Sequence, residues 1–495
     1  MFSYSGEQFS HDWRYKINQD FKTDSDEPFP YVEGGHLEWG SEDYKIMLPS
    51  QPTAVVVSSD NSLLAVAVEH DIHIFGTEEF KLQQVLKGHI SRVDAIAFQP
   101  GDANVLVSAA TNNYGGSVKA DCEVIIWDLH AQKTRPRIDE ATISNIAREA
   151  SDAVAARLSE GEVPLILTEA ESGNLSKDIE SLVTKLTTKH SVAEDAKIAG
   201  RLLTSFDTNY FNPSGDKLMY LPGNRPRSNS NVPWEMRVLS METRKDLFTL
   251  DGHTDAIMWS GFSPDETLIG TCCWDTTMRI WEAQNGNLKF RFETGKQNWT
   301  GGFSPDSKLF AGTSGDGTLY LYSMSDGSTL WSRQMNVDWC RHLSWSADSR
   351  MLAIGGRRLG TVFVIDVEQN EIVQQRELST DACKVDDERK KRLLKSYLEV
   401  HSVRYVDSGC KLVVFTVGDG GIEVYDLQKQ HKWRFARLGT DEDIPHEPPV
   451  DEPQGKSGYE AAIWEDSRNG KVMMAAVADN DVRVWSVPLD GASTQ

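Results

Sequence analysis

The sequence contains no segment that would carry the chain into or across a membrane. None of its apolar runs approaches the roughly 20 residues needed to span a bilayer. The first residues, MFSYSGEQFSHDW, lack the apolar core of a secretory signal. We therefore expect an intracellular protein, cytoplasmic, nuclear or both, without a membrane span.

Cysteine is scarce, and its spacing fits neither a disulfide framework nor a zinc site. The 495 residues include six cysteines, and no two of them form a CxxC pair. The six are Cys122, Cys272, Cys273, Cys340, Cys383 and Cys410. Scattered cysteines of this kind are typical of buried free thiols in a reducing compartment. The sequence therefore predicts no metal site built from cysteine.

Recognisable catalytic motifs are missing as well. The chain has no GxSxG, no HExxH, no P-loop and no GxGxxG that opens a helix after a strand. His70 and His73 fall in an expected strand, where residues three apart point to opposite faces, so they are not expected to share a metal ion. We predict a protein that is not an enzyme and that binds no cofactor.

The sequence has fewer basic than acidic residues. The chain has 51 basic and 74 acidic residues, which gives a net charge of −23. A field of this sign opposes binding to a phosphate backbone or an anionic membrane and favours basic partners. We expect no direct contact with nucleic acid. The hydrophobic fraction of 39% and the aromatic fraction of 9% are those of a globular protein rather than a disordered one.

Repetition is what the sequence has in abundance. Residues 262–281 read FSPDETLIGTCCWDTTMRIW, and residues 303–322, 41 positions later, read FSPDSKLFAGTSGDGTLYLY. Both place a polar turn before a short apolar run, and the run is followed by a second turn and an aromatic-ended run. Six looser copies occur at 56–68, 98–110, 211–221, 345–356, 405–417 and 464–477.

A second regularity runs in phase with these turns. An aspartate is followed six residues later by an aromatic residue in five of the units. The pairs are Asp121 and Trp127, Asp275 and Trp281, Asp316 and Tyr322, Asp419 and Tyr425, and Asp479 and Trp485. Where no insertion intervenes, neighbouring turns are 41 or 42 residues apart. An all-strand repeat of about 40 residues is typical of the blades of a β-propeller.

The repeats resemble those of the WD-repeat family over roughly residues 50–488. Gly-His pairs precede two of the units, at Gly88-His89 and Gly252-His253, and those units end at Trp127-Asp128 and Trp281-Glu282. In that family the histidine, the turn aspartate and the tryptophan form a hydrogen-bonded structural network. The resemblance implies such a role for His89, Asp121, Trp127, His253, Asp275 and Trp281, and the equivalent turn or strand position for Asp316, Asp419, Asp479 and Trp485. No strand serine or threonine is assigned to the network, because the fourth unit reads Thr271-Cys272-Cys273.

We therefore expect an all-β propeller of eight blades, with seven blades and an unpaired unit as the alternative. Residues 1–43 form an N-terminal extension, and residues 44–495 form a single propeller. The stretch YKIMLP at 44–49 is predicted to supply the outer strand of the last blade and so to close the ring. Residues 138–203 carry helical periodicity and are predicted to be an α-helical insertion between blades 2 and 3, which either packs on the propeller or binds a partner. Residues 439–456 are acidic and proline-rich and are predicted to be a loop.

Partners of WD-repeat propellers usually dock where the innermost strands begin, and tryptophan and arginine dominate binding hot spots. Alignment of the blades on their turns places six such residues at this face. They are Arg92, Trp274, Trp299, Trp339, Arg357 and Arg358. The alternative is that Trp299 and Trp339 only plug the mouth of the central channel.

The resemblance and the missing motifs together favour a non-catalytic scaffold or adaptor that binds protein partners within a multi-protein complex. The top face and the insertion are its expected binding surfaces. Two alternatives stay open. One is a substrate receptor that reads modified peptides, and the other is a propeller enzyme with a central-channel site that no motif reveals.

Overall fold

The computed structural model describes most of the chain. The described residues are 16–38, 40–110, 122–130, 194–204, 208–223, 226, 234–335, 337, 339–379, 398–416, 421–436, 461–478 and 480–490. Within these ranges the chain forms β-strands and one 3₁₀ turn, η1 (Asp407–Gly409), and no α-helix, so the described part is all-β. It contains no helix that is long and apolar enough to cross a membrane.

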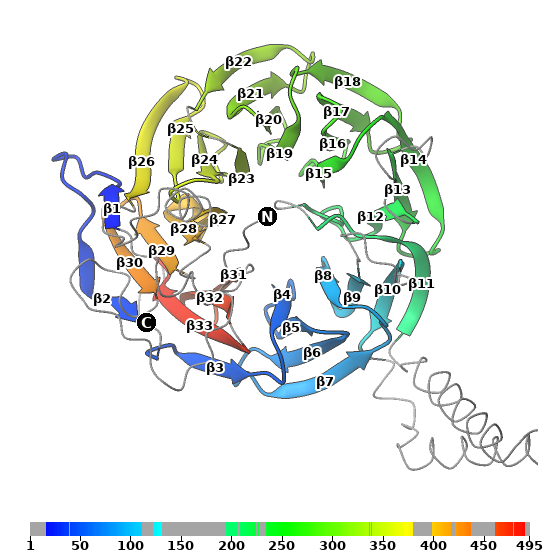
Figure 1. The fold of residues 1–495 in the computed structure, drawn as a ribbon, viewed down its shortest axis with the longest axis horizontal. Coiled ribbons are helices and arrows are strands. Elements are labelled where there is room, and N and C mark those ends of the chain that lie inside the picture. Colours follow the sequence, from blue (N-terminus) through cyan, green and yellow to red (C-terminus); the bar gives the residue numbers. More distant parts are fainter. Residues whose placement is uncertain are drawn as a thin grey trace, which may run out of the picture.

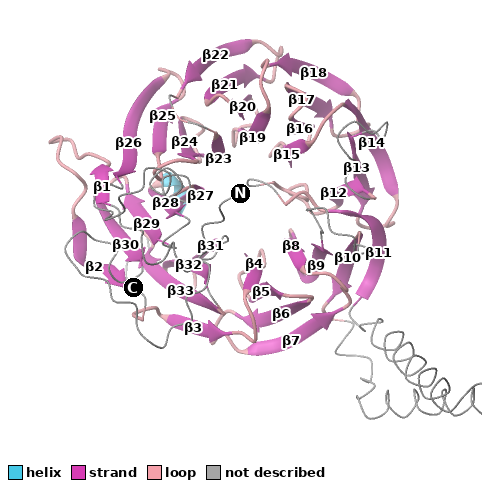
Figure 2. Cartoon of the chain, viewed as in Figure 1, coloured by secondary structure: helices cyan, strands magenta, loops and turns pink. Residues whose placement is uncertain are grey.

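The strands form seven sheets that stand side by side around a ring, and all their pairings are antiparallel except that of β2 with β30 (Figures 1 and 2). The first unit of four strands contains β4 (Pro52–Val57), β5 (Leu63–Val68), β6 (Asp71–Gly76) and β7 (Leu82–Lys87). The second contains β8 (Val93–Gln99), β9 (Asp102–Ala110), β10 (Glu123–Asp128) and β11 (Glu194–Arg201). The third contains β12 (Lys217–Pro222), β13 (Trp234–Ser240) and β14 (Asp246–His253).

Three further units follow along the ring. The fourth contains β15 (Ile257–Phe262), β16 (Leu268–Cys273), β17 (Thr277–Glu282) and β18 (Leu288–Glu293). The fifth contains β19 (Asn298–Phe303), β20 (Leu309–Ser314), β21 (Thr318–Ser323) and β22 (Thr329–Gln334). The sixth contains β23 (Cys340–Trp345), β24 (Met351–Gly356), β25 (Val362–Asp366) and β26 (Glu371–Ser379).

The last two units bring the chain back to its start. The seventh contains β27 (Val400–Val406), β28 (Lys411–Thr416), β29 (Gly421–Asp426) and β30 (His431–Ala436). The eighth contains β31 (Ala461–Asp466), β32 (Lys471–Ala478), β33 (Asp481–Pro488) and, from the other end of the chain, β3 (Tyr44–Met47). β3 pairs antiparallel with β33, as Tyr44 faces Val484 and Met47 faces Asp481.

The second and third units share one sheet of seven strands. Their link is short, because β11 pairs with β12 only at Gly200 with Pro222 and at Arg201 with Leu221. In place of a full innermost strand, the third unit has an isolated bridge between Phe211 and Leu218. Among the described residues the strands group into eight successive units, each with at least four strands except the third, which has three strands and a bridge.

Residues 194–201 correct the predicted boundaries of the helical insertion. These residues form β11, which pairs antiparallel with β10 and completes the second unit. An outer strand satisfies the backbone groups that β10 would otherwise expose along its edge, and this requirement outweighs a weak local periodicity. The rest of the predicted insertion, residues 138–193, lies outside the described residues, as does the predicted loop at 439–456.

Residues 16–38 are more than an extension preceding the ring. They form β1 (Lys16–Gln19), which pairs antiparallel with β26, and β2 (Tyr31–Glu38), which pairs parallel with β30. These strands become the fifth strands of the sixth and seventh units.

The hydrophobic core is divided into eight clusters, and each lies between two neighbouring units. Strand side chains alternate between the two faces of a sheet, so each unit has two apolar faces to bury. The cluster between the eighth and first units, which includes Val66 and Ala475, joins the two ends of the repeat array.

The repeated Ser-x-Asp turn links the fourth unit to the fifth and the fifth to the sixth. In the fourth, fifth and sixth units the serine hydroxyl donates to the aspartate two residues later at 2.6 Å. The backbone N–H of Asp265 then donates to the hydroxyl of Ser307 in the following unit at 3.0 Å, and that of Asp306 donates to Ser349 at 3.2 Å. The turn is therefore repeated because it closes its own loop and also contacts its neighbour.

The fourth unit contains a complete hydrogen-bonded network around Thr271. His253 contacts Asp275 through Nδ1 at 2.7 Å and Thr271 Oγ1 through Nε2 at 2.8 Å. Trp281 Nε1 donates to the same hydroxyl at 3.0 Å. Thr271 is therefore the strand hydroxyl that the sequence left unassigned.

The second unit uses a serine in the same place. Ser108 Oγ lies 2.7 Å from His89 Nε2 and accepts a hydrogen bond from Trp127 Nε1 at 2.7 Å. Asp121, Asp419 and Asp479 lie outside the described residues. Asp316 accepts hydrogen bonds from Ser314 and Thr318 within its own exposed turn. Trp485 is buried, with its ring centroid 5.8 Å from that of Phe435.

In the Thr271 network the histidine is held in its neutral form and the aspartate in its ionised form. Burial lowers the pKa of His253, so this histidine is neutral near pH 7 and its Nδ1–H donates to Asp275. Burial alone would raise the pKa of Asp275, but the hydrogen bonds from His253 and Thr277 outweigh it, and the pKa lies well below its ordinary value.

We predict that Thr271→Val lowers the free energy of unfolding by about 1–3 kcal/mol, because it leaves Trp281 Nε1 and His253 Nε2 buried without their partner. The matched control is Thr329→Val on the exposed edge strand β22, which should stay within about 0.5 kcal/mol of the native protein. Denaturant titration of the three proteins measures both values. Equal stabilities of the two variants would contradict a role for the Thr271 hydroxyl.

Asp275 should also contribute to acid sensitivity. Because its folded pKa is below the ordinary 3.8, the folded state binds fewer protons, so its stabilising effect is complete above about pH 4 and is lost as the pH falls further. The native protein should therefore lose stability more steeply below about pH 4 than Asp275→Asn, which has no such proton to bind. Parallel unfolding curves against pH would show that Asp275 is not coupled to folding.

Candidate functional site

The ring has one face at which the innermost strand of each unit begins and the second strand ends, and we call it the top face. Trp274 follows β16 at this face, Trp299 is the second residue of β19, and Trp339 immediately precedes β23. Arg357 follows β24 in the sixth unit. The predicted residues of three consecutive units therefore lie at the same end of their sheets.

These side chains contact one another in a continuous series. The rings of Trp274 and Trp299 meet edge to face with centroids 5.4 Å apart, and those of Trp299 and Trp339 are 4.7 Å apart. The guanidinium of Arg357 lies 4.3 Å from the centroid of the Trp339 ring. Both cation–π and aromatic contacts of this geometry are attractive, so the series is held together by its own side chains.

Arg341 is a member of this series that the sequence reasoning missed. Its guanidinium lies 4.6 Å from the Trp299 ring and 4.9 Å from the Trp339 ring, so one cation contacts both. Its Nη1 pairs with Glu399 at 2.7 Å, and both side chains are largely buried. Trp339 and Arg341 are two residues apart at the start of a strand, which places them on the same side. We define Trp274, Trp299, Trp339, Arg341 and Arg357 as the top-face cluster.

The backbone of Trp339 is strained. Its φ is +34°, a left-handed value that a bulky side chain rarely adopts. Such outliers cost on the order of 1–3 kcal/mol and persist only where the surroundings hold them in place. The rings and cations on both sides of Trp339 are such surroundings.

The members of the cluster differ in exposure. Trp299 is 5% exposed and forms its floor, with Gly315 close by, since a Cβ there would lie 3.2 Å from Trp299 Nε1. Trp274, Trp339 and Arg357 are partly exposed. Trp274 Nε1 has no hydrogen-bond partner among the residues that the structure describes.

Of the remaining two predicted residues, Arg92 lies apart from the top-face cluster and Arg358 lies beside it. Arg92 is exposed before β8 in the second unit, and within the described ranges no ring contact or ion pair joins it to the cluster. Arg358 is exposed next to Arg357, and its carbonyl oxygen accepts a hydrogen bond from Thr361 at 2.8 Å.

Three side chains of the fourth unit approach the geometry of a metal site. The ligand atoms of His253, Cys273 and Asp275 lie within 4.8 Å of one another. However, both ring nitrogens of His253 are engaged by Asp275 and Thr271, and the Cys273 thiol contacts the carbonyl of Asp255 at 3.1 Å. Burial and the nearby Asp275 raise the pKa of the Cys273 thiol, which disfavours the thiolate that binds metals. These residues belong to the structural network rather than to a metal centre.

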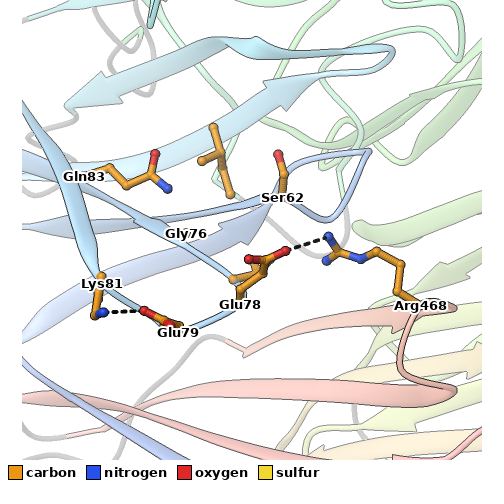
Figure 3. A pocket seen from close by; sticks show the side chains of 9 residues that line it. Ser62, Gly76, Glu78, Glu79, Lys81, Gln83 and Arg468 are labelled. Atoms are coloured by element: carbon orange, nitrogen blue, oxygen red, sulfur yellow. Dashed lines mark ion pairs between the residues drawn. The ribbon is translucent and has the colours of Figure 1, made fainter.

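A cavity of about 370 Å³ lies at the seam between the first and eighth units (Figure 3). Arg468 reaches across from the eighth unit to Glu78, with 3.8 Å between the charged atoms, and Lys81 pairs with Glu79 beside it. These charges are exposed and already paired with opposite charges. This cavity is a weaker candidate for a binding site than the top-face cluster, because exposed ion pairs of this kind contribute little free energy.

The ring contacts of the cluster predict a spectroscopic signature. Trp299 takes part in both tryptophan pairs, so Trp299→Phe should remove the exciton component of the circular dichroism spectrum that closely spaced indoles produce. Trp331→Phe on β22 is the control, because Trp331 is outside the cluster and donates to the carbonyl of Val367. The same spectral change in both variants would contradict the packing of these rings.

Comparison with known proteins now places the fold. The model of the WD domain, G-beta repeat, matches residues 244–282, which run from β14 to β17, and that of the major royal jelly protein matches residues 332–445. The solved structure of Sqt1 from Saccharomyces cerevisiae is similar with a TM-score of 0.55 and 11% identity. The match covers 90% of this chain and 99% of that one, and it supports the fold alone.

Three curated relatives are similar in sequence. Eukaryotic translation initiation factor 3 subunit I of Pyricularia oryzae is 29% identical over 39% of this chain. The ribosome biogenesis protein WDR12 homolog of Drosophila virilis is 27% identical over 24% of it, and the small ribosomal subunit protein RACK1 of Drosophila melanogaster is 33% identical over 17%. The matches span 61%, 29% and 28% of these relatives' own lengths.

Two of these relatives are named as subunits of larger assemblies. The matched repeat spans the Thr271 network, and the Sqt1 likeness extends over the whole ring. The chain has the fold of a β-propeller and is similar to WD-repeat proteins.

Proposed function

We propose that this protein is an eight-bladed propeller that acts as a non-catalytic intracellular scaffold or adaptor within a multi-protein complex. In this proposal residues 44–495 form one propeller, and the pairing of β3 with β33 closes it. Protein partners bind at the top-face cluster. The remainder of the predicted insertion, residues 138–193, is proposed as a second binding surface.

The observation that carries the proposal is the strained Trp339 between two cations. A strained tryptophan that is partly exposed beside Arg341 and Arg357 is a costly arrangement for a surface with no role. Tryptophan and arginine contribute most to binding hot spots because they bury a large area and still form hydrogen bonds at their edges.

The exposures of the side chains support a binding site rather than a plug of the channel. Trp299, at 5% exposed, has little surface left to offer and supports the others from below. Trp274 and Trp339 keep part of their rings accessible. A binding anchor needs such accessible aromatic surface over a rigid base.

The names of two relatives support a scaffold or adaptor function but do not identify the partner of this protein. Subunit I of an initiation factor and a small ribosomal subunit protein are components of assemblies. The net charge of −23 favours basic partners in the wider field of the molecule and disfavours nucleic acid. We propose that this protein contacts proteins and not nucleic acid directly.

Affinity capture from a cell lysate tests the site. The double variant Trp339→Ala with Arg357→Ala should lose captured partners by at least about tenfold, because hot-spot truncations cost about 2 kcal/mol or more. The matched control is Trp331→Ala with Arg333→Ala, which removes the same residue types from the outer strand β22. Thermal unfolding verifies that both variants are folded.

The outcomes separate the alternatives. Partners retained by the Trp339 and Arg357 variant would place the binding surface elsewhere. A partner set made of chemically modified peptides would favour a substrate receptor, and the absence of any stable partner would favour an enzyme with a site in the channel.

A further inference from the structure

The N-terminal strands β1 and β2 are additions to blades that are already complete. The sixth and seventh units contain four strands each without them, as do the first, fourth and fifth units, which carry no fifth strand. β3 differs, because it is the fourth strand of the eighth unit. A break between β2 and β3 would therefore leave all eight units with the strands they need.

Residues 16–38 add β1 and β2 to the outer edges of the sixth and seventh units, and the chain between these strands folds back in a turn, with Lys22 bridged to Pro28 (Figure 1). Two glutamine side chains bind the main chain of this segment. Gln374 of β26 accepts from the N–H of Lys22 at 2.8 Å and donates to the carbonyl of Lys22 at 2.8 Å. Reciprocal bonds of this kind hold a peptide backbone without regard to its side chains.

Gln430, in the seventh unit, also forms two hydrogen bonds with the segment, both with Asp24. It accepts from the N–H of Asp24 at 3.1 Å and donates to the carboxylate of Asp24 at 2.8 Å. The N–H of Lys432 donates to the carbonyl of Pro30 at 2.9 Å. Main-chain contacts therefore continue along the segment between β1 and β2.

One carboxylate of the segment enters a buried site. Asp20 pairs with the ammonium of Lys432 and accepts a hydrogen bond from the hydroxyl of Tyr425 at 3.1 Å. Lys432 is 2% exposed and Tyr425 is 0% exposed. Tyr31, also from the segment, covers Lys432 with its ring centroid 4.6 Å from Nζ. Loss of the Asp20 carboxylate would take this ion pair from a buried cation, which is unfavourable, so Asp20 makes a specific contact here.

Two aromatic side chains of the segment complete the site. Phe21 is 0% exposed and its ring centroid lies 4.3 Å from that of Tyr425, while Phe29 is 3% exposed and packs beside it. Both belong to the hydrophobic cluster between the sixth and seventh units. Beneath Tyr425, a Glu423 carboxylate oxygen lies 3.0 Å from the Tyr425 hydroxyl, which shares its one proton between Asp20 and Glu423, and Glu423 pairs with Arg376 at 2.6 Å, which fixes the base of the site.

We propose that the outer edges of β26 and β30 form a peptide-binding site and that residues 16–38 are its intramolecular ligand. The site takes a peptide that folds back on itself, in which a carboxylate residue is followed directly by an aromatic residue and a second aromatic, eight positions further on, packs against the first. Lys432 and Tyr425 read the carboxylate, the cluster between the two units receives the aromatic rings, and Gln374 and Gln430 hold the main chain.

The test uses the full chain with a specific protease site inserted after Gly40, between β2 and β3, and with Asp20→Asn to weaken the resident segment. After cleavage of the folded protein, a fluorescent peptide of residues 16–38 with the native sequence is added, and its anisotropy is measured. We expect the ring to stay folded and the peptide to displace the resident segment with one-to-one stoichiometry.

Variant peptides establish which contacts matter. Asp20→Asn and Phe21→Ala peptides should bind at least about tenfold more weakly than the native peptide, because each loses a buried contact. The Asp26→Asn peptide is the matched control, since Asp26 is exposed and pairs only at the surface with Lys22. It should bind like the native peptide.

Three results would overturn the proposal. The first is cooperative unfolding of the ring on cleavage, which would make the segment an integral part of the fold. The second is failure of the native peptide to enter the cleaved protein. The third is equal affinity of the Asp20→Asn and Asp26→Asn peptides.

Discussion

A four-stranded unit of this ring has two apolar faces, and exposure of either face to water is unfavourable. Each face is buried only when another unit packs against it, so the eight hydrophobic clusters lie between units rather than within them. An open row of such units would expose one face at each end. Closure of the ring is therefore the condition on which every other feature depends, and the cluster that joins Val66 to Ala475 satisfies it.

This constraint explains which residues repeat and which vary. The turn serine and aspartate close a loop and contact the next unit, so they recur wherever a unit has a similar neighbour. The histidine, hydroxyl and tryptophan network appears in the second and fourth units with Ser108 or Thr271 at its centre. Residues at the top face and at the outer edge of a sheet contribute little to the packing between units. They are therefore free to differ, and Trp274 and Gly315 occupy matching places in the two most similar repeats.

The sequence was sufficient to predict the all-β repeat because its signal is local and recurs every 41 or 42 residues. It also placed Trp274, Trp299, Trp339 and Arg357 at one face, since each occupies a fixed position in its repeat. Arg341 was missed because its role comes from contacts with two rings on different units, although the Trp-x-Arg spacing at 339–341 was a usable signal. β11 was wrongly included in a helix, because its identity as a strand depends on the open edge of β10.

The pairing of Asp20 with Lys432 could not be read from the sequence at all. The two residues are 412 positions apart, and the segment around Asp20 has no counterpart in the other units. Such contacts depend on surfaces that exist only after the ring has closed. Residues 16–38 add β1 and β2 to units that already have four strands. β3 instead supplies the fourth strand of the eighth unit, so neighbouring parts of the N-terminal segment have different structural roles. In the sixth unit β26 is an outer strand, whereas Arg341 is on the innermost strand β23, near the top face. A rigid blade can therefore present two separate binding surfaces without either disturbing the core between them.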